Sequence, residues 1–161
     1  MNFKPTAEPA ERRTLVITRE YAVPASVLFL AMSRPEHVKR WFGPVGYPLT
    51  LCEMDFRVGG HFRFQMTGPD GVKGTPFGGA YWEIIPDRKI VYDNGFEPPT
   101  EERMLVTMTL EARGARTLLT HHTEFASVAM YESHTGVGFE AGTNSGLDQL
   151  GDVAEALAAK A

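Results

Sequence analysis

The sequence predicts an α+β protein in which a curved antiparallel β-sheet of about seven strands is covered on its concave face by a long C-terminal helix. Two changes of hydrophobic period predict this arrangement. Between residues 47 and 124, apolar residues recur at every second position and short turns separate the runs, as in consecutive antiparallel strands. After Ala126 the spacing changes to the 3.6 residues of a helix. A sheet and a helix with one apolar side each bury those sides against one another.

The N-terminal third supplies one strand and two short helices. A β-rich run over residues 14–21 predicts the first strand. Pro24 opens a short helix, because proline suits the first helical turn, and Pro35 ends it, because the residue before a proline disfavours helical geometry. A second short helix is expected over residues 36–41. The lead-in, residues 1–12, has two prolines and mixed charge, and we expect it to be flexible.

Turn signals divide the region of period two. Glycines at 59 and 60 predict a tight turn, and Gly-Pro-Asp-Gly at 68–71 predicts a hairpin turn, since proline presets φ and glycine accepts a positive φ. The first of these strands is expected from about residue 47, and the others at about 61–67, 78–85, 89–94, 103–112 and 116–124. In the final helix the apolar stripe consists of Phe139, Gly142, Gly146, Leu150, Val153 and Leu157.

Length and composition limit the possible functions. The chain has 161 residues, so we expect a single domain over residues 13–161. Sixteen Lys and Arg against twenty Asp and Glu give a net charge of −4, without the basic excess of a nucleic-acid binder. No run approaches about 18 apolar residues, and the start resembles no signal peptide, so neither a membrane span nor export is expected. With one cysteine, the protein is expected to be cytoplasmic.

No motif for a metal, a nucleotide cofactor or a nucleophile is present. His121 and His122 are adjacent on a strand, so at most one faces the interior, and the spacing of a metal site is missing. Glu53 and Asp55 could form a carboxylate pair, but charges that alternate along a strand are typical of a solvated face. Cys52 neighbours a carboxylate, which disfavours a reactive thiolate. The sequence therefore predicts no catalytic residue, no metal and no cofactor.

Several segments together resemble one known family. The matching segments are Ile-Thr-Arg at 17–19, Val-Pro-Ala at 23–25, Trp-Phe-Gly-Pro at 41–44, Asp-Phe-Arg-Val-Gly-Gly-His-Phe-Arg-Phe at 55–64, Gly-Pro-Asp-Gly at 68–71, Tyr-Trp-Glu-Ile-Ile-Pro-Asp-Arg at 81–88, Gly-Phe-Glu-Ala-Gly at 138–142 and Leu-Asp-Gln-Leu at 147–150. By these motifs, residues 14–158 resemble the bacterial "activator of Hsp90 ATPase homologue 1-like" domain proteins. That family belongs to the START-like, or SRPBCC, superfamily with the helix-grip (Bet v 1-like) fold.

The resemblance implies a fold and an internal cavity rather than a reaction. Its members include binders of small hydrophobic ligands, and wider relatives include lipid carriers and polyketide cyclases. We therefore expect a protein that encloses a small hydrophobic or aromatic molecule between sheet and helix. The alternatives are an enzyme of cyclase or hydratase type and a stress- or chaperone-associated interaction module with Hsp90 as a partner. A homodimer is plausible because two-fold pairing is the commonest oligomer.

The expected cavity is lined by apolar side chains of the sheet and the last helix. The candidates are Trp41, Phe42, Met54, Phe62, Phe64, Met66, Tyr81, Tyr92, Met104, Met108, His121, Phe139, Gly142 and Gly146. Tyr81, Tyr92, one of the two histidines and Asn144 would orient the ligand. The two helical glycines each cost the helix roughly 0.5–1 kcal/mol against alanine, so the space they leave should have a use. The alternatives are a filled core or glycines that permit close helix packing.

Overall fold

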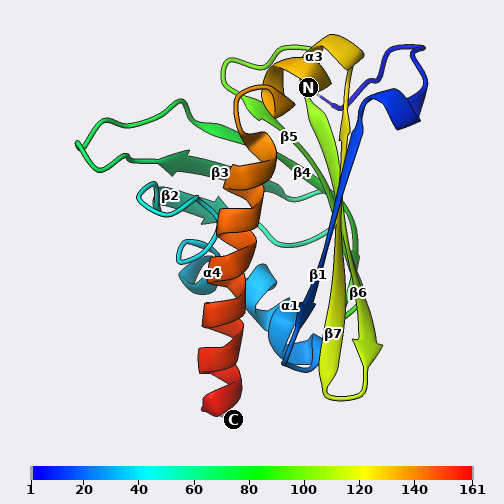
Figure 1. Ribbon diagram of the computed structural model, residues 1–161. Helices are drawn as coiled ribbons and strands as arrows, with labels where there is room; N and C mark the ends of the chain where they lie inside the picture. Colours follow the sequence, from blue (N-terminus) through cyan, green and yellow to red (C-terminus); the bar gives the residue numbers. More distant parts are fainter. Residues whose placement is uncertain (1, 161) are drawn as a thin grey trace.

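A computed structural model describes residues 2–160 (Figure 1). Its strands are β1 (Thr14–Tyr21), β2 (Leu49–Met54), β3 (His61–Met66), β4 (Phe77–Ile85), β5 (Lys89–Phe96), β6 (Met104–Arg113) and β7 (Arg116–Phe125). Its helices are the 3-10 turn η1 (Ala10–Arg12), then α1 (Ala25–Ser33), α2 (Pro35–Val38), α3 (Val128–Thr135) and α4 (Phe139–Ala159). The predicted α+β fold and its strand count are confirmed.

The seven strands form one antiparallel sheet in the order β1-β7-β6-β5-β4-β3-β2. The first strand in the chain therefore pairs with the last, and the other five follow as a meander. α4 crosses in front of this sheet, and α1 lies beside its C-terminal half (Figure 1). This is the helix-grip arrangement, with one layer of sheet and one long covering helix.

The structure differs from the expectation for the segment after β7, where two helices replace one. Ser127 caps α3, since its Oγ accepts a hydrogen bond from the backbone N–H of Met130 at 3.0 Å. Gly136 follows the last turn of α3, and Gly138 has φ 92°, a left-handed conformation that separates α3 from α4. The hydrophobic stripe in the sequence begins at Phe139 and so predicted only the second of these helices.

The lead-in makes defined contacts with the rest of the protein. Phe3 is buried, and its backbone N–H donates to Asp93 Oδ2 at 3.1 Å. The N–H of Thr6 donates to the carbonyl of Ala126 at 2.8 Å. Asp93 is itself fully buried and pairs with Arg103. The lead-in thus covers a buried ion pair on the face of the sheet opposite α4.

Candidate functional site

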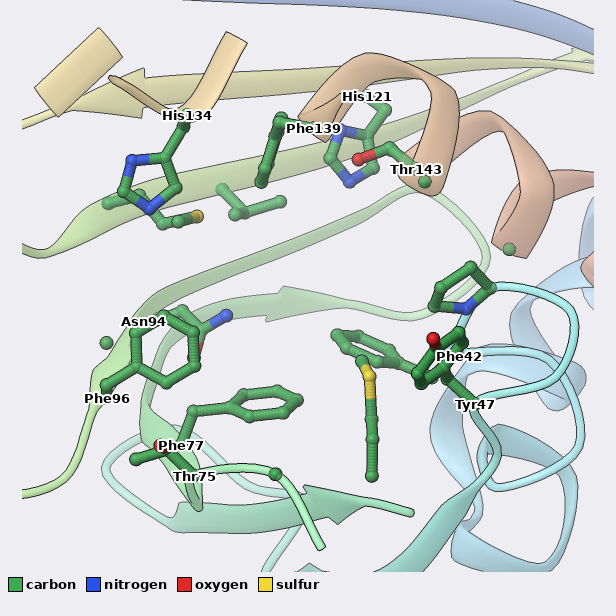
Figure 2. A pocket seen from close by; sticks show the side chains of 18 of the residues that line it. Phe42, Tyr47, Thr75, Phe77, Asn94, Phe96, His121, His134, Phe139 and Thr143 are labelled. Atoms are coloured by element: carbon green, nitrogen blue, oxygen red, sulfur yellow. The ribbon is translucent and has the colours of Figure 1, made fainter. Parts of the chain in front are cut away.

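A pocket of about 580 Å³ lies between the N-terminal half of α4 and the inner face of the sheet (Figure 2). Strands β5 and β6 form its floor, and the loops before β2, between β3 and β4, and between β5 and β6 form its sides. This volume falls in the range of about 300–1,000 Å³ that is typical of small-molecule sites.

The largest side chains in the walls are aromatic rings and methionine thioethers. β6 contributes Met104, Val106 and Met108, which alternate along the strand and so share the inner face. Phe77 from β4 stacks on Phe42 with ring centroids 5.9 Å apart and an interplanar angle of 27°. Flexible methionines beside flat rings make a lining that can adapt to more than one apolar shape.

The structure brings together ten of the fourteen residues that the sequence suggested. They are Trp41, Phe42, Met66, Tyr92, Met104, Met108, His121, Phe139, Gly142 and Gly146.

The other four, Met54, Phe62, Phe64 and Tyr81, do not border this pocket. They surround a neighbouring void of only about 30 Å³, together with residues of α1 and α2. Phe62 packs against Tyr81 at 5.5 Å between ring centroids and against Tyr92 at 5.3 Å. Their strand parity places them on the inner face, but the short helices cover that end of the sheet. This half of the interior is therefore the filled core that the sequence left as an alternative.

The two helical glycines have different roles. A Cβ at Gly142 would meet nothing within 4 Å, so this position opens onto empty space. A Cβ at Gly146 would lie 3.0 Å from the carbonyl oxygen of Phe42 and 3.1 Å from that of Trp41. Gly142 therefore leaves room in the pocket, whereas Gly146 allows α4 to approach the backbone of residues 41–42.

His121, rather than His122, faces the pocket, and its ring points inward beside Thr143 in Figure 2. Its Nδ1 lies 3.4 Å from the hydroxyl of the fully buried Thr123. Burial lowers the pKa of His121 to about 4, and the neighbouring His122 also contributes. The imidazole is therefore neutral at physiological pH and offers Nε2 for a hydrogen bond.

Four further polar groups border the pocket, and sequence reasoning missed them. Asn94 points its amide into the cavity, and Thr143, Thr75 and His134 line it from three other elements (Figure 2). Asn94 shares strand parity with Tyr92, so that signal was available in the sequence. His134 belongs to α3, which was not predicted as a separate helix. Its Nδ1 lies 2.9 Å from the carbonyl of Met130, so this nitrogen carries the proton.

Two of the orienting groups expected from the sequence lie elsewhere. The side-chain oxygen of Asn144 accepts a hydrogen bond from Arg19 of β1 at 3.3 Å, outside the pocket. Tyr81 borders the small void, where burial raises the pKa of its hydroxyl.

The residues set aside in the sequence stay outside the site. Burial raises the pKa of Cys52 to about 11, so its thiol is protonated at neutral pH. The carboxylate of Asp55 is exposed and paired with Arg57. Among residues 2–160, no three His, Cys, Asp or Glu side chains gather closely enough to hold a metal ion. Nor does any helix in that range have the length and apolar character needed to cross a membrane.

The rim of the pocket carries exposed apolar side chains and two carboxylates. Tyr47 and Val72 come from the loops before β2 and between β3 and β4, Phe96 is the last residue of β5, and all three are exposed to solvent. Asp70 and Glu102 contribute the carboxylates. An apolar rim around an apolar pocket is typical of a site that admits hydrophobic molecules.

The fold and the site together define a helix-grip protein with a pocket between the sheet and the C-terminal helix. Residues 22–155 match the family described as "Activator of Hsp90 ATPase homolog 1-like protein", and the chain belongs to this family. The family resemblance noted in the sequence is thereby confirmed. No curated protein matches the chain.

Solved bacterial structures share the fold. A solution structure of a protein from Arthrobacter aurescens has a TM-score of 0.85 at 26% identity, covering 92% of this chain and 89% of its own. A crystal structure of a protein from Nitrosomonas europaea has a TM-score of 0.81 at 24% identity and covers 89% and 95%. A crystal structure of a protein from Mycobacterium smegmatis has a TM-score of 0.79 at 24% identity and covers 90% and 92%.

Proposed function

We propose that this protein binds a small hydrophobic or aromatic molecule in the pocket beneath α4. The observation that carries the proposal is a pocket of about 580 Å³ in which aromatic rings and methionine thioethers line the space beneath α4. The pocket opens to solvent at its rim, so water occupies it when no ligand is bound. An apolar ligand that displaces this water gains about 25 cal/mol per Å² of apolar surface buried.

Gly142 supports the same conclusion. A glycine in the interior of a helix costs about 0.5–1 kcal/mol against alanine. In this helix the missing side chain relieves no clash, since nothing lies within 4 Å of the position a Cβ would take. Retaining the space above the pocket is the use that we assign to this glycine.

Binding is tested with N-phenyl-1-naphthylamine, an uncharged aromatic probe whose fluorescence rises in apolar surroundings. The protein is expected to bind it, and Gly142→Phe is expected to abolish binding by filling the pocket while leaving the protein folded. The matched control is Ala141→Phe, which adds the same ring to an exposed neighbour on α4. Equal binding by wild type and Gly142→Phe would contradict the proposal.

Native mass spectrometry of protein purified from its own host would complement the probe. A small molecule that co-purifies with wild type and is lost in Gly142→Phe would name the ligand class. A molecule retained by both would place its binding outside this pocket and would count against the proposal.

Membership of the family also favours a chaperone-associated role as a second candidate. This role requires a surface that contacts Hsp90, rather than the pocket. The discriminating measurement is the ATPase rate of Hsp90 from the same organism, with and without this protein. We expect no change, and a rate increase that survives Gly142→Phe would favour the chaperone role instead.

A further inference from the structure

We infer that the pocket selects uncharged apolar molecules and rejects anionic ones such as fatty acids, aromatic carboxylates or sulfonates. This inference rests on the proposed function and adds the charge of the ligand to it. Among the residues that line the pocket there is no lysine and no arginine. Carboxylates and sulfonates are bound in proteins chiefly by these two side chains, through charge-assisted hydrogen bonds.

His121, Asn94 and Thr143 place three uncharged hydrogen-bonding groups in the pocket. His121 lies between Met108 of β6 and Ile17 of β1, and its Nδ1 lies 3.4 Å from the hydroxyl of Thr123. Asn94 directs an amide into the cavity, and Thr143 contributes a hydroxyl (Figure 2). These groups suit a carbonyl, hydroxyl or amine of a neutral ligand.

The mouth of the pocket adds negative charge. Asp70 and Glu102 are the two acidic residues of the lining, and both are exposed. Lys73 lies between two lining residues in the β3–β4 loop, but its own side chain is exposed and outside the lining. An anion that enters would pass two carboxylates and would meet no lysine or arginine in the lining.

The energetic consequence favours neutral ligands strongly. Moving an ionised group out of water costs several kcal/mol unless an opposite charge and hydrogen bonds compensate it. The apolar part of a ligand gains about 25 cal/mol per Å² of buried surface, whatever its charge. Of two ligands with the same rings, the uncharged one is therefore expected to bind more tightly.

A matched pair of probes tests this directly. N-phenyl-1-naphthylamine is uncharged, and 8-anilinonaphthalene-1-sulfonate carries the same ring system with one sulfonate. At pH 8 and low salt, the neutral probe is expected to bind at least 10-fold more tightly. Only binding that Gly142→Phe removes is counted, so that surface adsorption of the anionic dye is excluded.

A variant that supplies the missing cation separates charge from size. Thr143 lies on α4 and points into the pocket (Figure 2), so Thr143→Lys places an ammonium there. Its affinity for the sulfonate probe is expected to rise about 10-fold relative to the neutral probe. Ala141→Lys is the matched control, since it adds the same charge to an exposed position of the same helix. In that control the ratio of the two affinities is expected to change less than about two-fold.

Each outcome decides the inference. If the sulfonate probe binds wild type as tightly as the neutral probe, the inference is overturned while the proposed function stands. If it binds more weakly and Thr143→Lys brings no recovery, size rather than charge excludes it, and the inference is again overturned. If neither probe binds the folded protein, the proposed function itself is contradicted.

Discussion

The two halves of α4 face the same sheet yet have opposite surroundings. In the C-terminal half, which packs against α1 and β1, Leu150 and Ala154 are fully buried. In the N-terminal half, Phe139 and Gly142 border the pocket and are only half-buried. The C-terminal half therefore anchors the helix, which allows the N-terminal half to cover an open space without collapsing into it.

The boundary between the two halves lies at Gly146. There the backbone of α4 comes close to the carbonyls of residues 41 and 42. Gln149 donates to the carbonyl of Trp41 at 3.4 Å, and the backbone N–H of Val45 donates to Ser145 Oγ at 3.0 Å. These hydrogen bonds fix the loop before β2, which forms one side of the pocket, to the middle of the helix.

The largest expected change in stability comes from truncating one buried side chain in each half of α4. Leu150→Ala is expected to lower the free energy of unfolding by about 2–5 kcal/mol, because it creates a cavity in a fully packed region. Phe139→Ala removes a larger side chain but is expected to cost less, because part of its surroundings is already open. Urea unfolding of both variants measures the difference. A greater loss in Phe139→Ala would contradict the contrast between the halves.

The sequence correctly predicted which side chains of the sheet and of α4 face the interior. Strict alternation in β6 and β7, and the stripe of α4, fix which side chains face inward, because the period follows from backbone geometry. The alternation of side chains along a strand does not show which helices or loops cover each part of the inner face of the sheet. Phe62 and Met104 both point inward, yet α1 and α2 pack near Phe62 while Met104 faces the pocket.

The two glycines of α4 also show that a local sequence pattern does not reveal contacts with distant segments. Gly142 and Gly146 are one helical turn apart and looked equivalent in the sequence. Their difference comes from residues 41–42, which lie about a hundred positions earlier and approach only one of them. Contacts between distant segments are not encoded in local period, so the open and the closed glycine could not be separated without the structure.

The next largest expected change is a loss of folding stability at low pH, which comes from the buried His121. The pKa of His121 is lowered to about 4 in the folded protein, against about 6.5 for an unfolded histidine. Between these values the unfolded chain binds more protons, so stability is expected to fall by about 2–3 kcal/mol as the pH drops from 6.5 to 4.

Thermal unfolding across that range measures this effect of acid. His121→Gln is expected to flatten the slope, while His122→Gln, on the other face of β7, is expected to keep most of it. Glu8 and Glu97, whose pKa values are lowered by their hydrogen-bond partners, contribute only below about pH 4.5. An unchanged slope in His121→Gln would show that His121 is not buried in the neutral form.

Alanine substitutions at the two glycines are expected to change the free energy of unfolding by smaller amounts and in opposite directions. Gly142→Ala is expected to raise the free energy of unfolding by about 0.5–1 kcal/mol, from helix propensity alone. Gly146→Ala gains the same propensity but forces apart backbone atoms that are already 3.0 Å from the new Cβ, and it is expected to be net destabilising by about 1 kcal/mol. If both substitutions stabilise equally, the close approach at Gly146 is wrong.

The smallest expected change in stability concerns an exposed ion pair on the outer face of α4. Arg19 of β1 pairs with Asp148, whose side chain is 66% exposed. Because water and salt screen such a pair, Asp148→Asn is expected to cost less than about 1 kcal/mol, and less still at high ionic strength. Urea unfolding at two salt concentrations measures this. A larger loss would mean that α4 is held from outside as well, and that the buried contacts of its C-terminal half are not sufficient to keep the pocket open.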